Sequence, residues 1–137
     1  MTRTIQIAAV LPGPPERLFD MYLDPLEHAA FTGMPAVVSA TPGAPFSAFG
    51  GVITGTMLQV VPKRLIVQAW RSPYWTPADL DSTLVLTFLP DPAGTRIELV
   101  QANVVDADFA GVSQGWEKYY WTPWRDYLAR TTAPEKA

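Results

Sequence analysis

Hydrophobic residues near the end of the chain recur at helical spacing. Every fourth position from residue 112 to residue 128 is apolar or aromatic, and aromatic residues also occupy the adjoining side. A helix this apolar needs a large partner surface, so we expect one long C-terminal helix that lies across a sheet. The residues on its apolar side are Val112, Trp116, Tyr120, Trp124 and Leu128, with Tyr119, Pro123 and Tyr127 beside them.

Apolar and polar residues alternate in much of the preceding chain, which is typical of strands. Leu84, Leu86 and Phe88 share one face of such a strand, and Ile97 and Leu99 continue that face on the next. Short turns predict hairpins, so the last four strands should form an antiparallel meander. The predicted strands are a first one that ends at Leu11 and six more at 36–40, 45–49, 52–61, 64–71, 82–89 and 95–103.

Two short helices are predicted between the first two strands. Closely spaced prolines at positions 12–15 suit a helical first turn, because the amides there have no helical acceptor. Asp24-Pro25 divides the first helix from the second, and Gly33 and Pro35 end the second. These elements predict an α+β fold in which an antiparallel sheet wraps around the terminal helix.

Pro123 lies inside the long helical pattern. Proline removes a backbone donor and crowds the carbonyl of Tyr119, so we expect the helix to be kinked or divided there. Our hypothesis is that the gap left near Pro123 forms part of a ligand cavity or its entrance.

Length and composition are those of one globular domain. Of the 137 residues, 48% are hydrophobic and 17% are charged, and no apolar run approaches the roughly 20 residues that span a membrane. We predict one domain over residues 1–130 and a disordered tail over 131–137. The first residues lack the pattern of a signal segment, which predicts a soluble, cytoplasmic protein.

The net charge and the cysteine count limit the classes of partner. A formal net charge of −3 argues against nucleic-acid and anionic-membrane surfaces, since those need clustered basic residues. The absence of cysteine excludes disulfides, thiol catalysis and thiolate metal sites. The partners that remain are a small molecule or another protein.

Few residues offer catalytic or metal-binding chemistry. The only histidine, His28, is predicted to lie beside Glu27 on a polar helix face, which indicates a surface residue. Two pairs of carboxylates fall in loops, where they solvate the chain or cap a helix, and Asp108 suits the cap of the terminal helix. We predict no catalytic residue, metal or cofactor; the two pairs are Asp79 with Asp81 and Asp106 with Asp108.

Two amides are predicted among apolar neighbours. Gln68 shares a strand face with Ile66 and Trp70, and Gln101 continues the face of Leu99. A buried amide without a partner costs roughly 1–3 kcal/mol, so each needs a hydrogen bond, a water or a ligand. The alternative is that a sheet edge or a bulge exposes both amides to solvent.

Four short segments stand out by their order and spacing. They are Gly51-Val52-Ile53-Thr54-Gly55, Val61-Pro62-Lys63-Arg64, Ala69-Trp70-Arg71 and Gln114-Gly115-Trp116-Glu117-Lys118-Tyr119-Tyr120. Together with the predicted order of strands and helices, they resemble the activator of ninety-kilodalton heat-shock protein ATPase homologue family. That family belongs to the START-like, or SRPBCC, helix-grip superfamily, and the resemblance spans residues 4–128.

The resemblance implies a seven-stranded antiparallel sheet around the terminal helix. It also implies an internal hydrophobic cavity, which relatives use for lipids, hormones, polyketides or other apolar ligands. In the eukaryotic co-chaperone, the corresponding domain is the C-terminal half, and the principal chaperone-binding, ATPase-stimulating half precedes it.

Our leading functional hypothesis is non-enzymatic binding of a small apolar or aromatic molecule between the sheet and the C-terminal helix. Apolar walls would give affinity, and the two amides would orient the ligand. The predicted walls are Ile53, Met57, Trp70, Leu86, Phe88, Leu99, Trp116 and Tyr120, and the predicted hydrogen-bonding groups are Gln68 and Gln101.

Two other classes of function remain open. The chain could be a protein-interaction module or stress-response co-chaperone that binds a chaperone, or a second copy of itself, through exposed Trp75, Trp121 or Trp124. It could also be a cyclase- or hydrolase-type enzyme that uses Tyr120 or Asp81 for proton transfer.

Overall fold

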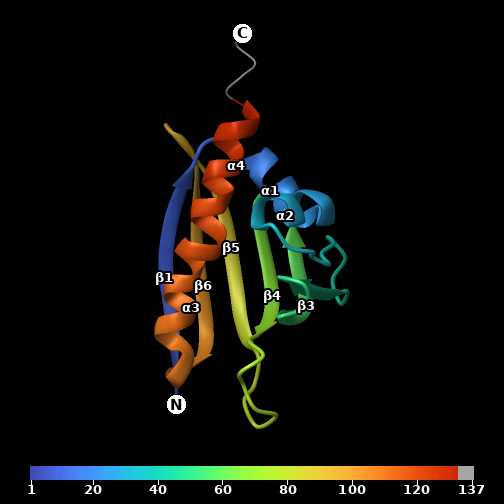
Figure 1. Ribbon diagram of the computed structural model, residues 1–137, viewed down its shortest axis with the longest axis vertical. Coiled ribbons are helices and arrows are strands. Elements are labelled where there is room, and N and C mark those ends of the chain that lie inside the picture. Colours follow the sequence, from blue (N-terminus) through green and yellow to red (C-terminus); the bar gives the residue numbers. More distant parts are fainter. Residues whose placement is uncertain (133–137) are drawn as a thin grey trace.

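Six antiparallel strands form one sheet in the computed structural model, which describes residues 1–132. The spatial order of the strands is β1-β6-β5-β4-β3-β2, so the chain runs as a meander from β2 to β6 and then pairs β6 with β1. Figure 1 shows the C-terminal helical run lying lengthwise across the sheet. The strands are β1 (Thr2–Leu11), β2 (Pro45–Ala48), β3 (Ile53–Val61), β4 (Leu65–Arg71), β5 (Ser82–Asp91) and β6 (Gly94–Val105).

The prediction of a seventh strand at residues 36–40 is wrong. In that segment only Val37 pairs with the sheet, through two 2.9 Å hydrogen bonds that its backbone exchanges with Ser47. Pro35 and Pro42 flank the segment and have no backbone N–H to donate, so a longer ladder would lose hydrogen bonds at both ends. The sheet therefore ends at the four-residue strand β2.

Strand β3 approaches β4 unusually closely at Gly55. A Cβ atom built there would lie 1.8 Å from the carbonyl oxygen of Ala69, and no side chain fits at that distance. Gly55 is also the residue directly opposite Trp70 in the register of the two strands. The glycine therefore permits the strand pairing that positions the Trp70 indole.

The two helices predicted after the first strand are present as α1 (Pro15–Leu23) and α2 (Pro25–Thr32). Both begin at a proline, as expected for a first turn without helical acceptors. Asp24 ends α1 and caps α2, where its carboxylate accepts a 2.9 Å hydrogen bond from the backbone N–H of Leu26. Gly33 then ends α2 in the left-handed conformation.

The C-terminal helix is one continuous run with three kinds of hydrogen bonding rather than a uniform long helix. A single 3₁₀ turn, η1 (Asp106–Asp108), precedes α3 (Phe109–Gly115), a π-helical segment, η2 (Trp116–Trp121), and α4 (Thr122–Thr132). The backbone N–H of Thr122 donates to the carbonyl of Glu117, five residues earlier, just before Pro123. A proline ring crowds the carbonyls of the preceding helical turn. The wider π-helical turn moves those carbonyls away from the ring, so Pro123 is accommodated directly after it.

The π-helical segment supplies three buried aromatic residues. Trp116, Tyr120 and Trp121 are all buried. Trp124 and Leu128 continue the buried side along α4.

The alternation predicted for β5 and β6 is confirmed by the core. Leu84, Leu86, Phe88, Ile97 and Leu99 are all at most 1% exposed, and they lie under the helices. No described helix combines the length and the apolar character that crossing a membrane requires. Residues 131 and 132 complete α4, and the remainder of the predicted tail, residues 133–137, lies outside the described residues.

Candidate functional site

A cleft of about 450 Å³, partly open to solvent, lies between α3 with η2 and the β3–β4 side of the sheet. The end of α2, the turn between β2 and β3, strand β4 and the loop after it complete the walls. Most of the lining is apolar or aromatic. The lining residues are Thr32, Met34, Phe49, Val52, Ile53, Trp70, Ser72, Pro73, Tyr74, Asp108, Gly111, Val112, Gly115, Trp116, Tyr119 and Tyr120.

Phe49 reaches the cleft from a turn with unusual backbone conformation. It has φ 56°, in the left-handed region, and Gly50 and Gly51 follow with φ 67° and 94°. A non-glycine residue in this region costs on the order of 1 kcal/mol or more. The conformation places the Phe49 ring edge-on to Tyr120, with 5.3 Å between ring centroids, and 6.0 Å from Tyr119.

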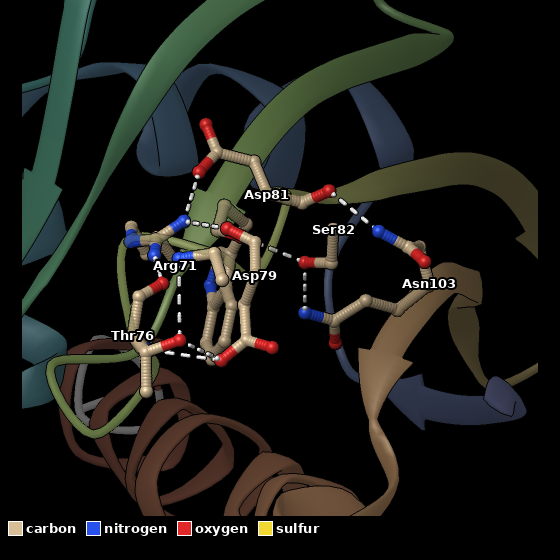
Figure 2. A network of polar contacts seen from close by, with 9 residues as sticks. Arg71, Thr76, Asp79, Asp81, Ser82 and Asn103 are labelled. Carbon is tan, nitrogen blue, oxygen red and sulfur yellow. Dashed lines mark hydrogen bonds and ion pairs between the residues drawn. The ribbon is translucent and has the colours of Figure 1, made fainter. Parts of the chain in front are cut away.

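An arginine holds the loop on the opposite side of the cleft. Arg71 donates from Nη1 to the carbonyl of Asp79 at 2.8 Å and to the carboxylate of Asp81 at 2.9 Å, and from Nη2 to the carbonyl of Thr76. Figure 2 shows this network, in which Asn103 of β6 also donates to the carbonyl of Asp81. The loop begins immediately after β4, and its first three residues line the cleft. Arg71 therefore shapes one wall without entering it.

Gln101 connects the helix to two strands through its side-chain amide. Its Oε1 accepts from the indole N–H of Trp116 at 2.9 Å, and its Nε2 donates to the hydroxyl of Ser82 at 3.0 Å. Ser82 in turn donates to the carbonyl of Trp70 at 2.8 Å. This chain of hydrogen bonds fixes the indole of Trp116 and joins it, through Gln101 and Ser82, to the backbone of β4 at Trp70.

Gln68 is the second buried amide and lies deeper in the core. Its Oε1 accepts from the Tyr22 hydroxyl at 2.6 Å, and its Nε2 lies 3.3 Å from the sulfur of Met57. The alternative that a sheet edge or bulge exposes Gln68 and Gln101 is wrong, because both are 0% exposed. Protein groups occupy their hydrogen-bonding atoms, so neither lines the cleft.

The prediction that His28 lies on the surface is wrong. His28 is completely buried between the backbone of α1 and the C-terminal helix. Its Nδ1 lies 2.8 Å from the carbonyl of Tyr22, which can only accept, so Nδ1 carries the proton. Its Nε2, 2.9 Å from the Tyr120 hydroxyl, must then accept from that hydroxyl in the neutral ring.

Burial keeps the cluster of His28, Tyr22 and Tyr120 uncharged at neutral pH. Desolvation lowers the pKa of His28 to about 4, because a charged imidazolium is disfavoured away from water. The same burial raises the pKa of the Tyr22 and Tyr120 phenols well above their usual value. Tyr120 is thus a neutral group whose proton is directed at His28.

The predicted wall residues divide into two sets. The cleft is lined by Ile53, Trp70, Trp116 and Tyr120, whereas the closed core holds Met57, Leu86, Phe88 and Leu99 together with the two amides. Pro123 lies C-terminal to every helical residue of the lining, so the cleft is not centred on the proline.

Several lining residues, among them Tyr119 and Tyr74, were not predicted from the sequence. Tyr119 was placed on the side of the helix next to the main apolar side, and it is 52% exposed at the mouth of the cleft. Tyr74 falls in a segment with no periodic pattern, and it is 84% exposed. Only the presence of an aromatic residue in a proline-rich loop could have pointed to Tyr74.

The expectation that Trp75, Trp121 or Trp124 is exposed is wrong. All three are buried, with Trp75 the most exposed at 7%. The Trp75 indole N–H donates a 2.8 Å hydrogen bond to Oδ2 of Asp108. The prediction that the Asp108 side chain caps the terminal helix is therefore wrong. The side chain faces the loop and the cleft instead.

Within residues 1–132, no group of three or more His, Cys, Asp or Glu side chains is arranged to hold a metal ion.

Fold and cleft define an α+β protein in which a curved antiparallel sheet grips a C-terminal helix. The sequence pattern of the family described as "Activator of Hsp90 ATPase homolog 1-like protein" matches residues 12–129. The chain belongs to this family.

Curated relatives share modest sequence identity with this chain. The human "Activator of 90 kDa heat shock protein ATPase homolog 1" is 29% identical over 106 residues, which cover 77% of this chain and 31% of that protein. The homologue from Dictyostelium discoideum is 27% identical over 118 residues, which cover 85% of this chain and 30% of that protein. The chain thus matches about a third of the length of these relatives.

Solved structures share the fold over nearly the whole chain. An HSP90 activator from Plasmodium falciparum superimposes with a TM-score of 0.82 at 23% identity, covering 92% of this chain and 96% of that one. A protein from Mesorhizobium loti gives a TM-score of 0.79 at 26% identity, covering 94% and 98%.

Proposed function

We propose that this protein binds a small apolar or aromatic molecule in the cleft between the sheet and the C-terminal helix, without transforming it. The observation that carries the proposal is a cleft of about 450 Å³ whose wall is largely aromatic. That volume suits a ligand of two or three rings or a short acyl chain, and apolar walls give such ligands affinity. The aromatic lining residues are Phe49, Trp70, Tyr74, Trp116, Tyr119 and Tyr120.

The rigid part of the wall supports recognition of a defined shape. The Trp116 indole is tied to the sheet by its hydrogen bond to Gln101, and Gln101 in turn donates to Ser82, so this indole is not free to collapse into the cleft. Phe49 adopts a costly backbone conformation at the same site, and backbone strain concentrates at functional sites.

The polar groups near the cleft support binding rather than catalysis. Tyr120 separates His28 from the cleft, and it donates its proton to the only ring nitrogen that could act as a base. With a pKa near 4, His28 is also a weak base. Asp81, the other predicted proton-transfer group, is paired with Arg71 and does not line the cleft.

The test is a fluorescence titration with the neutral probe N-phenyl-1-naphthylamine, whose emission rises in apolar surroundings. We expect saturable binding that is lost in Val112→Trp, because that substitution fills the cleft. The matched control is Val61→Trp, an equal increase in size at an exposed position outside the cleft. Saturable binding that survives in Val112→Trp with its fold intact would refute the site.

A second candidate function is docking of a heat-shock ATPase. The names of the curated relatives support it, as does a cluster of exposed apolar side chains around the cleft mouth, namely Met34, Val52, Tyr74 and Tyr119. The measurement is the ATPase rate of the ninety-kilodalton heat-shock protein of the same host with and without this chain. Stimulation that is lost in Tyr74→Ser and Tyr119→Ser would support docking, and an unchanged rate would count against it.

A homodimer, a cytoplasmic location and a stress-response role stay predictions. Sedimentation velocity over a range of protein concentrations would test the homodimer directly.

A further inference from the structure

We infer that the cleft selects organic cations: apolar or aromatic molecules that carry an amine or a quaternary ammonium group. The inference rests on the proposed function and adds the charge of the ligand to it. Two features of the cleft carry it, an unneutralised carboxylate and a wall of aromatic side chains without any basic side chain.

The carboxylate is Asp108, and no cation neutralises it. Among residues 1–132, its one hydrogen bond to a side chain is the 2.8 Å contact from the neutral indole of Trp75 to Oδ2, and no ion pair includes it. Arg3 pairs with Asp106, two residues before Asp108, at 3.8 Å, and its guanidinium lies over the ring of Phe109. Asp108 is half-buried at the cleft wall, so its negative charge is only partly screened by water.

The start of α3 offsets part of this charge. Asp108 is the residue at the helix N-terminus, where the aligned backbone dipoles carry a partial positive charge of roughly half an elementary unit. A partial charge does not cancel a full carboxylate, and the Asp108 side chain accepts no hydrogen bond from the backbone there. The negative charge of Asp108 at the cleft wall is therefore not cancelled by a full positive charge.

The aromatic wall acts in the same direction. Ring faces of Trp, and to a lesser degree Tyr, attract a cation placed within about 6 Å of their centroids. The ring centroids of Trp70 and Trp116 lie 6.4 Å apart, and those of Trp116 and Tyr120 lie 4.8 Å apart, so three lining rings are neighbours in one wall of the cleft. Lys118 lies 5.3 Å from the Tyr119 ring, but its side chain is exposed and does not line the cleft.

An anionic ligand would meet the opposite conditions. A carboxylate or phosphate entering the cleft would lose water and would find no Arg, Lys or His among the lining residues. It would also be repelled by Asp108 across a partly desolvated space. Fatty acids and other anionic amphiphiles are therefore disfavoured relative to amines with the same apolar body.

The experiment compares three probes that share a naphthalene body: 2-naphthylmethylamine, 2-naphthylmethanol and 2-naphthylacetate. In calorimetric titrations at pH 7 and low salt, we expect the amine to bind about tenfold more tightly than the alcohol. The acetate should have the lowest affinity of the three. In Asp108→Asn the amine-to-alcohol affinity ratio should fall to about one, since asparagine keeps an acceptor for Trp75 but removes the charge. Asp106→Asn is the matched control, because Asp106 pairs with Arg3 and lies outside the cleft; the ratio should not change.

The possible outcomes separate the two proposals. An amine that binds no more tightly than the alcohol, or a ratio that survives in Asp108→Asn, overturns the cation inference and leaves the cleft as a neutral binding site. If none of the three naphthalenes and no N-phenyl-1-naphthylamine binds, the proposed function fails and the cation inference fails with it.

Discussion

The hydroxyl of Tyr120 donates a 2.9 Å hydrogen bond to Nε2 of His28, although the two residues are 92 positions apart in the sequence. One lies on the short helix α2 and the other on the π-helical segment of the C-terminal helix, so the bond ties these elements together inside the core. Phe31, also on α2, stacks on Trp124 with ring centroids 4.2 Å apart. The bond depends on a neutral imidazole, because Nε2 accepts the proton of the hydroxyl.

Acid should destabilise the protein through His28. The pKa of its ring is about 4 in the folded protein and about 6.5 in the unfolded chain, so between these values only the unfolded chain binds the proton. The contribution of His28 to the free energy of unfolding is therefore fully present above about pH 6.5. It is lost as the pH falls toward 4, and the total loss from this group is about 3 kcal/mol. Urea unfolding at pH 7.5 and 4.5 would measure the loss, after comparison with a variant that cannot titrate.

That variant is His28→Gln, whose amide can donate to the Tyr22 carbonyl and accept from Tyr120. We expect a smaller dependence of unfolding free energy on pH than in the wild type. An equal dependence in both proteins would show that other groups cause the acid sensitivity.

Removal of the Tyr120 hydroxyl should cost about 1–2 kcal/mol of stability. Tyr120→Phe keeps the ring packing but leaves Nε2 of the buried His28 without a donor. The matched control is Tyr119→Phe, on the adjacent residue, which is half exposed and whose hydroxyl can be solvated. Thermal and urea unfolding should show little change for the control; equal losses in the two variants would contradict this role of the hydroxyl.

Gly55→Ala should be strongly destabilising, by about 2 kcal/mol or more. The added methyl group would overlap the carbonyl oxygen of Ala69, so β3 must shift away from β4 and disturb the pairing opposite Trp70. Gly111→Ala serves as the comparison, because its Cβ would meet only ordinary contacts in helix α3. There alanine should stabilise by about 0.5–1 kcal/mol. Similar unfolding midpoints for both variants would contradict the close approach.

Phe49→Gly should separate ligand binding from stability. Glycine adopts the left-handed conformation without the penalty that Phe49 incurs, and this gain offsets part of the lost ring packing. We therefore expect stability to change by less than about 1 kcal/mol. Affinity for N-phenyl-1-naphthylamine should fall severalfold, since one aromatic wall is removed. Unchanged affinity would exclude Phe49 from the binding surface.

Local patterns in the sequence were sufficient to predict most of the fold. Leu84, Leu86 and Phe88 alternate with more polar residues, and the period of two shows which side of β5 faces the core. The four-residue spacing of Trp116, Tyr120 and the residues beyond likewise predicted a helix packed on the sheet. The prediction of a seventh strand at 36–40 was wrong. The apolar pattern there does not show whether a neighbouring strand can pair along the segment, and the prolines near its two ends cannot donate backbone hydrogen bonds.

The candidate site was less predictable from sequence. Gln68 and Gln101 were predicted to share strand faces with apolar residues. Their hydrogen-bond partners are brought to them only when the strands and helices pack, and these partners are Tyr22, Ser82 and Trp116. The same packing hides His28, which sequence analysis placed on the surface. Strand and helix periodicity depends on neighbours a few residues apart, and the sequence by itself determined those elements. Whether a polar group is buried, and whether aromatic rings leave a space between them, depends on contacts across the fold, so only the tertiary structure decided the cleft.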